Sequence, residues 1–572
     1  MRNQLKLALL VILVTTTTGY HAADAGKGNA NCLVETTYGF VLGQDLGLSC
    51  AFLGIPYAAP PTGNSRWQPP SPAVPWAPAV LIATSPAVGC PSNFGSGVPS
   101  GSEDCLRLNI WVNGSVSPAQ PAPVLVWLHT GAFVAASSNF SGTNGRRFAE
   151  ETGVIVVAPN YRLGALGFLA HAALESEDPG RPSTGNYGLL DQRAALEWVR
   201  DNIARFGGDP DNVTLGGTSA GGQSTGLHLV APGSEGLFHG AIIQSAYPTS
   251  GWATRDEAVM QGDAFAAALG CTDPALVLDC MRAATRDQVL AALPLATQQV
   301  VEPVNRAFWE PIVDGFEIPD QPRVLFELGD FHHVPTIVGS NRDEGWGAFI
   351  TRSFPAGVSQ AQYEAWIMTE FGDDAAAILA AYPAANFTSP TEALARVVGD
   401  GQFRCEARRL ADLMADGGLR GRGPHDQQGT GRREKMPVFL YSYEYELDVL
   451  SLDHVIHGVE SNIIFGNNYV APPLPANHVL TTADLWLHDV MAGYWSQFVA
   501  TGDPNWLVLP LPYPVGRWRD EVLWPEYRKN HEEHIVFDQD ITTVDDTGGD
   551  VCALWSAFFF RSMLADVPAA HQ

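Results

Sequence analysis

Six short runs of mostly apolar residues, rich in β-branched side chains, are spread along the chain. They are Val124–Leu128, Val154–Ala158, Val213–Gly217, Ala241–Ser245, Pro335–Gly339 and Val438–Ser442. Such runs are typical of strands that are buried on both faces of a parallel sheet. The chain is therefore predicted to contain six of these strands.

Helical patterns lie between the runs. Leu189–Phe206 carries apolar side chains on one face at helical spacing, namely Leu190, Ala194, Leu196, Val199 and Ile203. Strands that alternate with helices predict an α/β fold with a central, mostly parallel, doubly wound sheet and helices on both faces.

Two longer stretches, about 252–331 and 355–435, are rich in Ala and Leu and show no strong strand pattern. We predict that they are helical insertions over one end of the sheet, where substrate pockets form. Residues 419–435 are predicted to be an exposed loop. Because no stretch has the composition of a linker, residues 26–572 are predicted to form one domain.

The first 25 residues have the pattern of a secretory signal peptide. Basic residues at the start precede the apolar run Leu7–Val14, which is shorter than the roughly 20 residues that span a bilayer as a helix. Ala23-Asp24-Ala25 resembles a cleavage site. We therefore expect residues 1–25 to be removed and the mature protein to be secreted or periplasmic.

Composition narrows the classes of function. The 572 residues include 33 Lys and Arg and 61 Asp and Glu, which gives a net charge of −28. Because a protein needs a basic surface to bind the phosphates of a nucleic acid, no nucleic-acid partner is expected. The hydrophobic fraction of 46% excludes a disordered acidic chain. The eight cysteines all follow the signal peptide, and an even number in an exported chain indicates disulfides. No later apolar run is long enough to span a membrane.

The motif G-x-S-x-G occurs at Gly217–Gly221, after a predicted strand and before a plausible helix. In that context it forms a tight turn that exposes the serine oxygen, and the flanking glycines relieve crowding. A serine hydroxyl is a weak nucleophile, so it needs a histidine base that an acid orients. Ser219 is therefore the candidate nucleophile of a hydrolase.

Two acids and two histidines could complete the triad in the order Ser, acid, His. Asp343 and Glu344 both follow the strand Pro335–Gly339, and His454 and His457 lie further on. The residues alone leave both choices open. The two histidines could also bind a metal, but no H-E-x-x-H motif is present, and neither a metal nor a cofactor is expected.

The oxyanion of a tetrahedral intermediate needs hydrogen-bond donors. A predicted strand runs into His129-Thr-Gly-Ala-Phe133, where small residues allow backbone N–H groups to face a pocket. The candidate donors are the N–H groups of Gly131, Ala132 and Ala220, the last directly after the nucleophile. His129 is predicted to pack and orient this loop rather than to transfer protons.

Together with the elbow, further motifs resemble those of the type-B carboxylesterases, the family of cholinesterases, carboxylesterases and related lipases. They are Phe52–Ala58, Ser102–Asn109, Asn160–Gly164, Asn186–Gln192, Phe206–Pro210 and Gly502–Asn505. The resemblance covers most of the chain after residue 25. It implies the α/β-hydrolase fold, serine carboxylesterase activity without a cofactor, and the triad Ser219, Glu344 and His457.

The resemblance also implies how the cysteines pair. It joins Cys90 to Cys105, Cys271 to Cys280, and Cys405 to Cys552. Cys32 and Cys50 are left as the fourth pair.

Departures from the family bear on the substrate. Cholinesterases carry a glutamate before the nucleophile, where this chain has Thr218, and the loop Pro91–Asp104 has one aromatic residue, Phe94, and no tryptophan. Choline binding depends on aromatic faces and nearby carboxylates, so choline esters are not expected. The same loop is too short for the lid of an interfacial lipase. Soluble or dispersed esters are the expected partners.

Three alternatives stay open. Without the glutamate at position 218, the enzyme could prefer esters that carry free carboxylates, such as the tricarballylate side chains of fumonisin-type mycotoxins. A non-catalytic cholinesterase-like binding protein is the alternative from another class, although such relatives usually lack the serine or the histidine. An amidase or thioesterase could use the same triad. The oligomeric state is not predicted.

Overall fold

The fold is that of a computed structural model, which describes eleven stretches of the chain. These are residues 32–93, 99–177, 183–292, 309–347, 349–416, 436–447, 454–468, 479–505, 522–529, 531–546 and 551–556. The predicted signal peptide, Phe94 and the predicted loop 419–435 lie outside them. No helix in these stretches has both the length and the apolar character needed to cross a membrane.

One mixed sheet of 13 strands runs through the described residues. The strands are β1 (Leu33–Thr36), β2 (Gly39–Asp45), β3 (Ser49–Pro56), β4 (Val80–Ala83), β5 (Arg107–Asn113), β6 (Ala122–Leu128), β7 (Ile155–Pro159), β8 (Gly208–Thr218), β9 (Gly240–Gln244), β10 (Thr336–Asn341), β11 (Val438–Tyr443), β12 (Glu533–Phe537) and β13 (Thr542–Asp545). Their order is β1-β2-β3-β5-β7-β6-β8-β9-β10-β11-β12-β13, and β4 pairs with β2.

The six predicted strands correspond to β6 to β11 and form a continuous parallel block in the order β7-β6-β8-β9-β10-β11. The predicted α/β architecture is confirmed. The antiparallel strands β1, β2, β3 and β5 beside this block were not predicted. β1 and β2 have exposed positions. β3 and β5 are largely buried but are interrupted by polar residues, glycine or proline, so none of the four has the continuous apolar pattern that marks the central strands.

Two hydrophobic clusters cover the two faces of the sheet. Along β6, Val124, Val126 and Leu128 belong to the first cluster, whereas Leu125 and Trp127 belong to the second. Successive side chains of a strand point to opposite faces, so both faces of β6 are buried. Helices α5, α6, α10 and α15 contribute to the first cluster, and α2, α16 and α17 contribute to the second.

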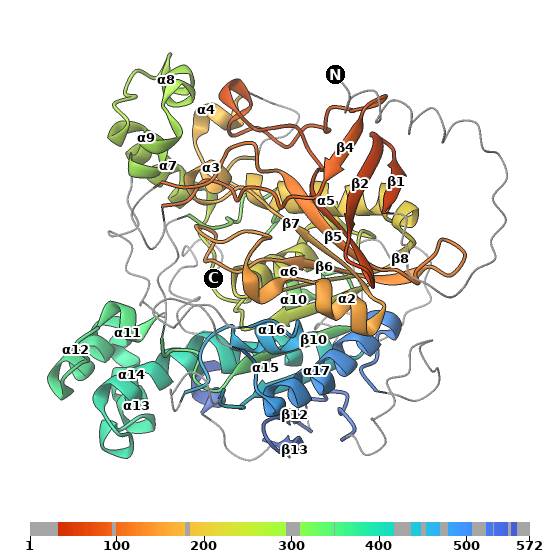
Figure 1. Cartoon of the computed structure of the whole chain (residues 1–572). Helices are drawn as coiled ribbons and strands as arrows, with labels where there is room; N and C mark the ends of the chain where they lie inside the picture. Colours follow the sequence, from red (N-terminus) through yellow and green to blue (C-terminus); the bar gives the residue numbers. More distant parts are fainter. Residues whose placement is uncertain are drawn as a thin grey trace, which may run out of the picture.

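The described helices follow the predicted alternation with the strands. They are α2 (Arg146–Thr152), α3 (Gly164–Phe168), α4 (Ala172–Glu175), α5 (Tyr187–Asn202), α6 (Ala220–Val230), α7 (Arg255–Ala268), α8 (Val277–Ala283), α9 (Arg286–Ala292), α10 (Pro322–Leu328), α11 (Ile350–Ser353), α12 (Gln360–Phe371), α13 (Ala375–Ala381), α14 (Pro390–Gly399), α15 (Cys405–Asp416), α16 (Val459–Ile464) and α17 (Thr482–Thr501). In Figure 1, α7 to α9 lie at the upper left and α11 to α14 at the lower left, away from β1, β2 and β4. Within the described residues, the first predicted insertion contains α7 to α10 and the second contains α12 to α15, so both are largely helical. The prediction that they lie over one end of the sheet is wrong for α10 and α15, which pack on one of its faces.

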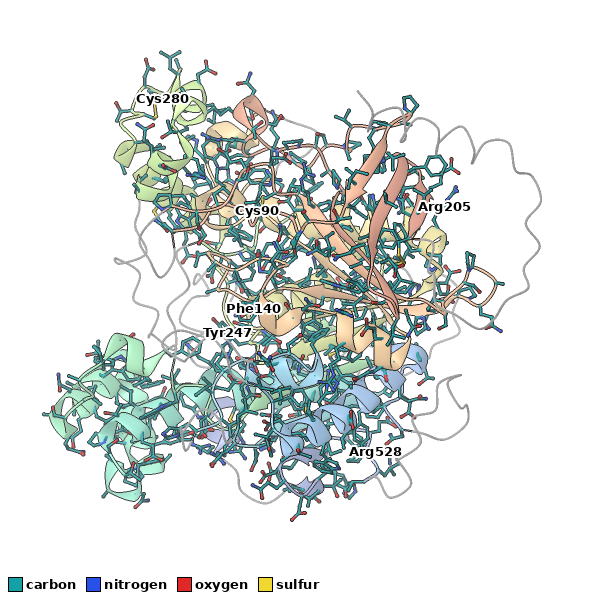
Figure 2. All side chains as sticks on the ribbon, viewed as in Figure 1. Cys90, Phe140, Arg205, Tyr247, Cys280 and Arg528 are labelled. Carbon is teal, nitrogen blue, oxygen red and sulfur yellow. A yellow bond between two sulfur atoms is a disulfide. The ribbon has the colours of Figure 1, made fainter. Side chains whose placement is uncertain are left out.

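Four disulfides join the eight cysteines: Cys32 to Cys50, Cys90 to Cys105, Cys271 to Cys280, and Cys405 to Cys552. These are the pairs that the sequence analysis arrived at. The labelled Cys90 and Cys280 lie in the upper half of Figure 2. Disulfides are typical of chains that mature in an oxidising compartment.

Candidate active site

Ser219 lies at a sharp turn between β8 and α6. Its backbone has φ 59° and ψ −123°, a conformation that residues with a side chain rarely adopt. Two hydrogen bonds hold this turn: the N–H of Ser219 donates to the carbonyl of Gln244 at 2.9 Å, and its carbonyl accepts from the N–H of Gln223 at 2.8 Å. The strand end and the first turn of α6 thus force the strained geometry of a nucleophile elbow.

The two glycines of the motif are required by close packing. A Cβ atom on Gly217 would lie 2.6 Å from the carbonyl oxygen of Leu128, and one on Gly221 would lie 2.1 Å from the same oxygen. Any side chain at either position would clash with the end of β6. The close approach of the Leu128 carbonyl is therefore the steric reason for the two glycines that flank Ser219.

The same packing brings the loop after β6 to the elbow. A Cβ on Gly221 would also lie 3.1 Å from the carbonyl oxygen of His129. In this loop Gly131 has φ 120° and Ala132 has φ 50°. No described residue accepts a hydrogen bond from the backbone N–H of Gly131, Ala132 or Ala220, so these three groups are available as donors.

His129 packs as predicted. Its ring stacks on Tyr161 at 4.2 Å between ring centres, and Nδ1 lies 2.8 Å from the carbonyl oxygen of Thr130. Burial lowers the pKa of His129 to about 4, so the ring stays neutral near pH 7. It orients the loop that carries Gly131.

Glu344 and His457 form a buried pair. Oε2 of Glu344 lies 2.5 Å from Nδ1 of His457, and the N–H of Asn341 donates to Oε1 of Glu344 at 2.7 Å. The side chain of Glu344 is fully buried and that of His457 is 10% exposed. A carboxylate can only accept, so the proton of the imidazole sits on Nδ1 and leaves Nε2 as the acceptor.

The other acid and histidine left open by the sequence do not make such a pair. Oδ2 of Asp343 lies 3.9 Å from Nδ1 of His454, beyond hydrogen-bonding distance. The ring of His454 instead packs on Trp346 at 4.1 Å. Geometry thus favours Glu344 and His457 over their neighbours.

His457 lies beside the elbow. The next residue, Gly458, is close to Thr218: a Cβ there would lie 3.7 Å from its methyl carbon. The hydroxyls of Thr218 and Ser461 are 2.6 Å apart and join the elbow to α16. Nε2 of His457 is buried without a hydrogen-bond partner among the described residues. It is therefore available to accept the proton of a nearby hydroxyl.

Glu460 is a second buried carboxylate at this site, and the sequence analysis missed it. Its Oε2 accepts from Nδ2 of Asn341 at 2.6 Å, and its Oε1 accepts from the hydroxyl of Ser245 at 3.2 Å. Burial, followed by the charge of Glu344, raises its pKa well above the ordinary range. The available signal was its position three residues after His457, in the first turn of α16.

Aromatic rings pack around the imidazole of His457, and one of them, Phe403, comes from the second predicted insertion. Phe349 and Phe403 lie 5.2 Å and 5.0 Å from the ring of His457, and Tyr247 packs on Phe403 at 5.4 Å. Phe403 belongs to a short π-helix, Asp400–Arg404, that joins α14 to α15. Figure 2 shows Tyr247 near the middle of the molecule, above the helices of this insertion. The second predicted insertion therefore contacts His457 through Phe403.

A potential metal site among the described residues lies elsewhere, at Glu151, His488 and Asp489. His488 already has contacts with protein atoms on both ring nitrogens, at 2.7 Å each, to Glu151 and to the carbonyl of Ile463. Both ring nitrogens of His488 therefore already face protein acceptors.

Comparison with known proteins identifies the family. A model of the carboxylesterase family matches residues 30–555. The chain is 32% identical to acetylcholinesterase of Electrophorus electricus, with 89% of this chain and 85% of that protein covered. It is 31% identical to acetylcholinesterase of Danio rerio, with 97% and 92% covered. The chain belongs to the carboxylesterase family. It is a carboxylic ester hydrolase with the α/β-hydrolase fold of that family.

For this carboxylesterase family member, the electrostatics of His457 predict how activity depends on pH. Burial alone lowers the pKa of His457, but the charge and hydrogen bond of Glu344, with the charge of Glu460, outweigh it and raise the pKa above its ordinary 6.5. Only a neutral imidazole accepts a proton, so kcat/KM should fall as the pH drops through this raised pKa.

Removing the carboxylate of Glu460 should shift the acid limb of the pH profile of kcat/KM. Glu460→Gln deletes a negative charge that favours protonated His457, so the limb is expected to shift to lower pH by about half a unit to one unit. The pH profile of kcat/KM measures this shift. Glu446→Gln, a change at a half-exposed carboxylate bound to Arg342, is the control and should leave the profile unchanged. A shift to higher pH in Glu460→Gln would contradict this electrostatic role.

Proposed function

We propose that this chain is a secreted serine esterase that hydrolyses small, soluble carboxylic esters through an acyl-enzyme. The observation that carries the proposal is the Glu344–His457 pair. Nε2 of its imidazole lies buried beside the Ser219 elbow, without a hydrogen-bond partner among the described residues. The four disulfides and the predicted signal peptide support secretion.

In the proposed mechanism, Oγ of Ser219 attacks the ester carbonyl while Nε2 of His457 takes its proton. Glu344 holds the imidazole through Nδ1 and stabilises the imidazolium. The N–H groups of Gly131, Ala132 and Ala220 donate to the oxyanion. The protonated imidazole then gives its proton to the departing alcohol, and water repeats the sequence on the acyl-enzyme.

The surroundings of the nucleophile favour neutral esters over choline esters. Position 218, next to Ser219, holds a buried threonine whose hydroxyl bonds to Ser461, so no carboxylate occupies this place in the site. Glu460, another carboxylate at the site, has both its oxygens engaged by Asn341 and Ser245. A cation would therefore gain little charge stabilisation here, although both relatives are acetylcholinesterases.

Labelling by a fluorophosphonate probe tests the nucleophile directly. The wild-type protein is expected to react at Ser219, identified by mass spectrometry of the labelled peptide, and to lose esterase activity in proportion. Absence of both labelling and ester hydrolysis would favour the non-catalytic binding protein.

A panel of esters tests the substrate class. Neutral p-nitrophenyl esters are expected to be hydrolysed with a higher kcat/KM than acetylcholine or a matched choline ester. The panel should pair an ester bearing a free carboxylate with its neutral analogue, because preference for the acidic member would favour the alternative of carboxylate-bearing substrates. Preference for the choline ester would overturn the proposed class.

A further inference from the structure

Two loops that bring Glu344 and His457 together are joined by three hydrogen bonds, one between main-chain groups and two that involve a side chain. The N–H of Asp343 donates to the carbonyl of Val455 at 3.1 Å, and the N–H of Val455 donates to Oδ2 of Asp343 at 2.9 Å. Nδ2 of Asn341 donates to the carbonyl of Ile456 at 2.9 Å. Val455 and Ile456, which precede His457, are therefore hydrogen-bonded to Asp343 and Asn341, which precede Glu344.

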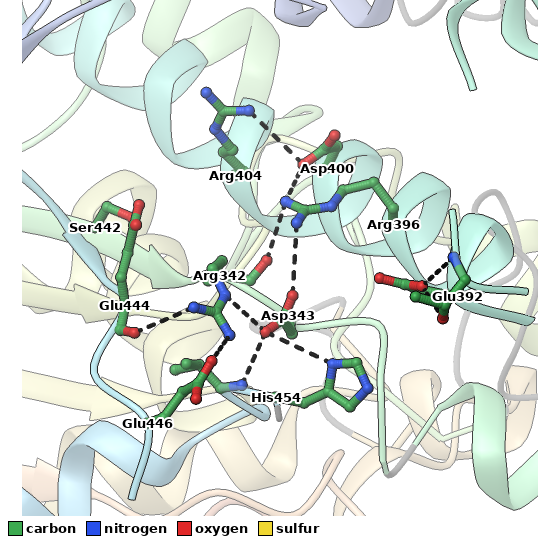
Figure 3. A network of polar contacts seen from close by, with 12 residues as sticks. Arg342, Asp343, Glu392, Arg396, Asp400, Arg404, Ser442, Glu444, Glu446 and His454 are labelled. Atoms are coloured by element: carbon green, nitrogen blue, oxygen red, sulfur yellow. Dashed lines mark hydrogen bonds and ion pairs between the residues drawn. The ribbon is translucent and has the colours of Figure 1, made fainter. Parts of the chain in front are cut away.

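The carboxylate of Asp343 is itself held by two arginines. Nε of Arg342 donates to Oδ2 at 2.9 Å, and Nη2 of Arg396 lies 3.5 Å from Oδ1 (Figure 3). Arg396, from α14, also donates to the carbonyl of Arg342 at 3.3 Å and lies 3.8 Å from Asp400. Asp343 is therefore anchored on one side and bound to the histidine loop on the other.

We propose that Asp343 is a positioning residue that sets the distance between Glu344 and His457 by accepting the N–H of Val455, an inference that rests on the proposed triad. Asp343 does not contact the imidazole of His457. Its neighbour His454 is too distant for a hydrogen bond, so a second acid–base pair does not explain the arrangement. Figure 3 shows the Asp343 carboxylate between the arginines and the backbone of the histidine loop.

The positioning role predicts that Asp343→Ala lowers kcat more than Asp343→Asn does. Asp343→Ala removes the acceptor of Val455 and should lower kcat by about 10- to 100-fold, because a displacement of about 1 Å in a reacting group costs about 100-fold. KM should change by less than about threefold, since substrate binding is not the property affected. Asp343→Asn keeps an acceptor oxygen and should stay within about fivefold of the wild type.

A spectroscopic measurement separates positioning from general stability. The proton between Nδ1 of His457 and Glu344 should give a downfield proton resonance in the wild type. In Asp343→Ala this resonance should weaken or move upfield, and Asp343→Asn should restore it. Glu446→Gln, which loses a carboxylate bound to Arg342 at 2.7 Å but no contact to the histidine loop, should keep both the resonance and kcat.

The outcomes for the two Asp343 variants and the wild type test the positioning role separately from the proposed function. If Asp343→Ala keeps the wild-type kcat and the wild-type resonance, the inference is wrong. If Asp343→Asn loses as much as Asp343→Ala, charge rather than the hydrogen bond is responsible, and the inference is also wrong. If Asp343→Ala does not fold, hydrogen exchange on the wild type decides: a protected Val455 amide supports the inference, and exchange at the rate of a free peptide overturns it. A wild type that shows the resonance but no esterase activity refutes the proposed function and not the positioning.

Discussion

Replacing Ser219 with alanine is expected to lower kcat by about 10⁴- to 10⁶-fold and to abolish labelling by a fluorophosphonate. The substitution removes the oxygen atom that is proposed to form the acyl-enzyme. It leaves the backbone donors of the loop after β6, and therefore a residual rate above that of water. Single-turnover assays with a chromogenic ester measure both the loss and the residual rate.

A second serine provides the control for this result. Ser176 ends α4, is exposed, and its hydroxyl donates only to the carbonyl of Ala173. Ser176→Ala should retain kcat within about twofold, as expected of a surface substitution. The nucleophile would be misassigned if Ser219→Ala retained wild-type turnover while its fold, measured by circular dichroism, was intact.

Glu344→Gln is expected to lower kcat by about 10³- to 10⁴-fold. Glutamine has the shape of glutamate, and its carbonyl oxygen can still accept from the N–H of Asn341. Its amide nitrogen then faces Nδ1 of His457, which lies 2.5 Å from Oε2 in the native chain. The imidazole must turn to the tautomer with the proton on Nε2, and that tautomer cannot accept a proton from Ser219.

Comparison with Asp343→Asn shows which of the two adjacent acids belongs to the triad. If Glu344→Gln stayed within tenfold of the wild type while Asp343→Asn lost 10³-fold or more, the acid of the triad would be Asp343. Glu446→Gln controls for the removal of a carboxylate close to the same loop and should leave kcat unchanged. Steady-state kcat for the four proteins at one pH above the acid limb is sufficient.

The main features of the fold could be read from the sequence because burial on both faces is a local property. β6 to β11 each bury apolar side chains on both sides, so their position and type were visible without tertiary contacts. β1, β2 and β13 have exposed positions and few apolar residues, so their pairing depends on the strands beside them. Long-range pairing is not encoded in a local pattern, and these strands were missed.

The sequence by itself determined the block of parallel strands, the elbow at Ser219 and the set of candidate acids and bases. The family resemblance, itself read from sequence motifs, already implied Glu344 and His457. Only the tertiary structure shows their side chains in contact, because that contact depends on the turn after β10 and on the loop that α16 follows. It also joined Glu460 to Asn341, and Asp343 to Val455. These two roles arise from contacts between segments more than 100 positions apart, which no spacing in the sequence reveals.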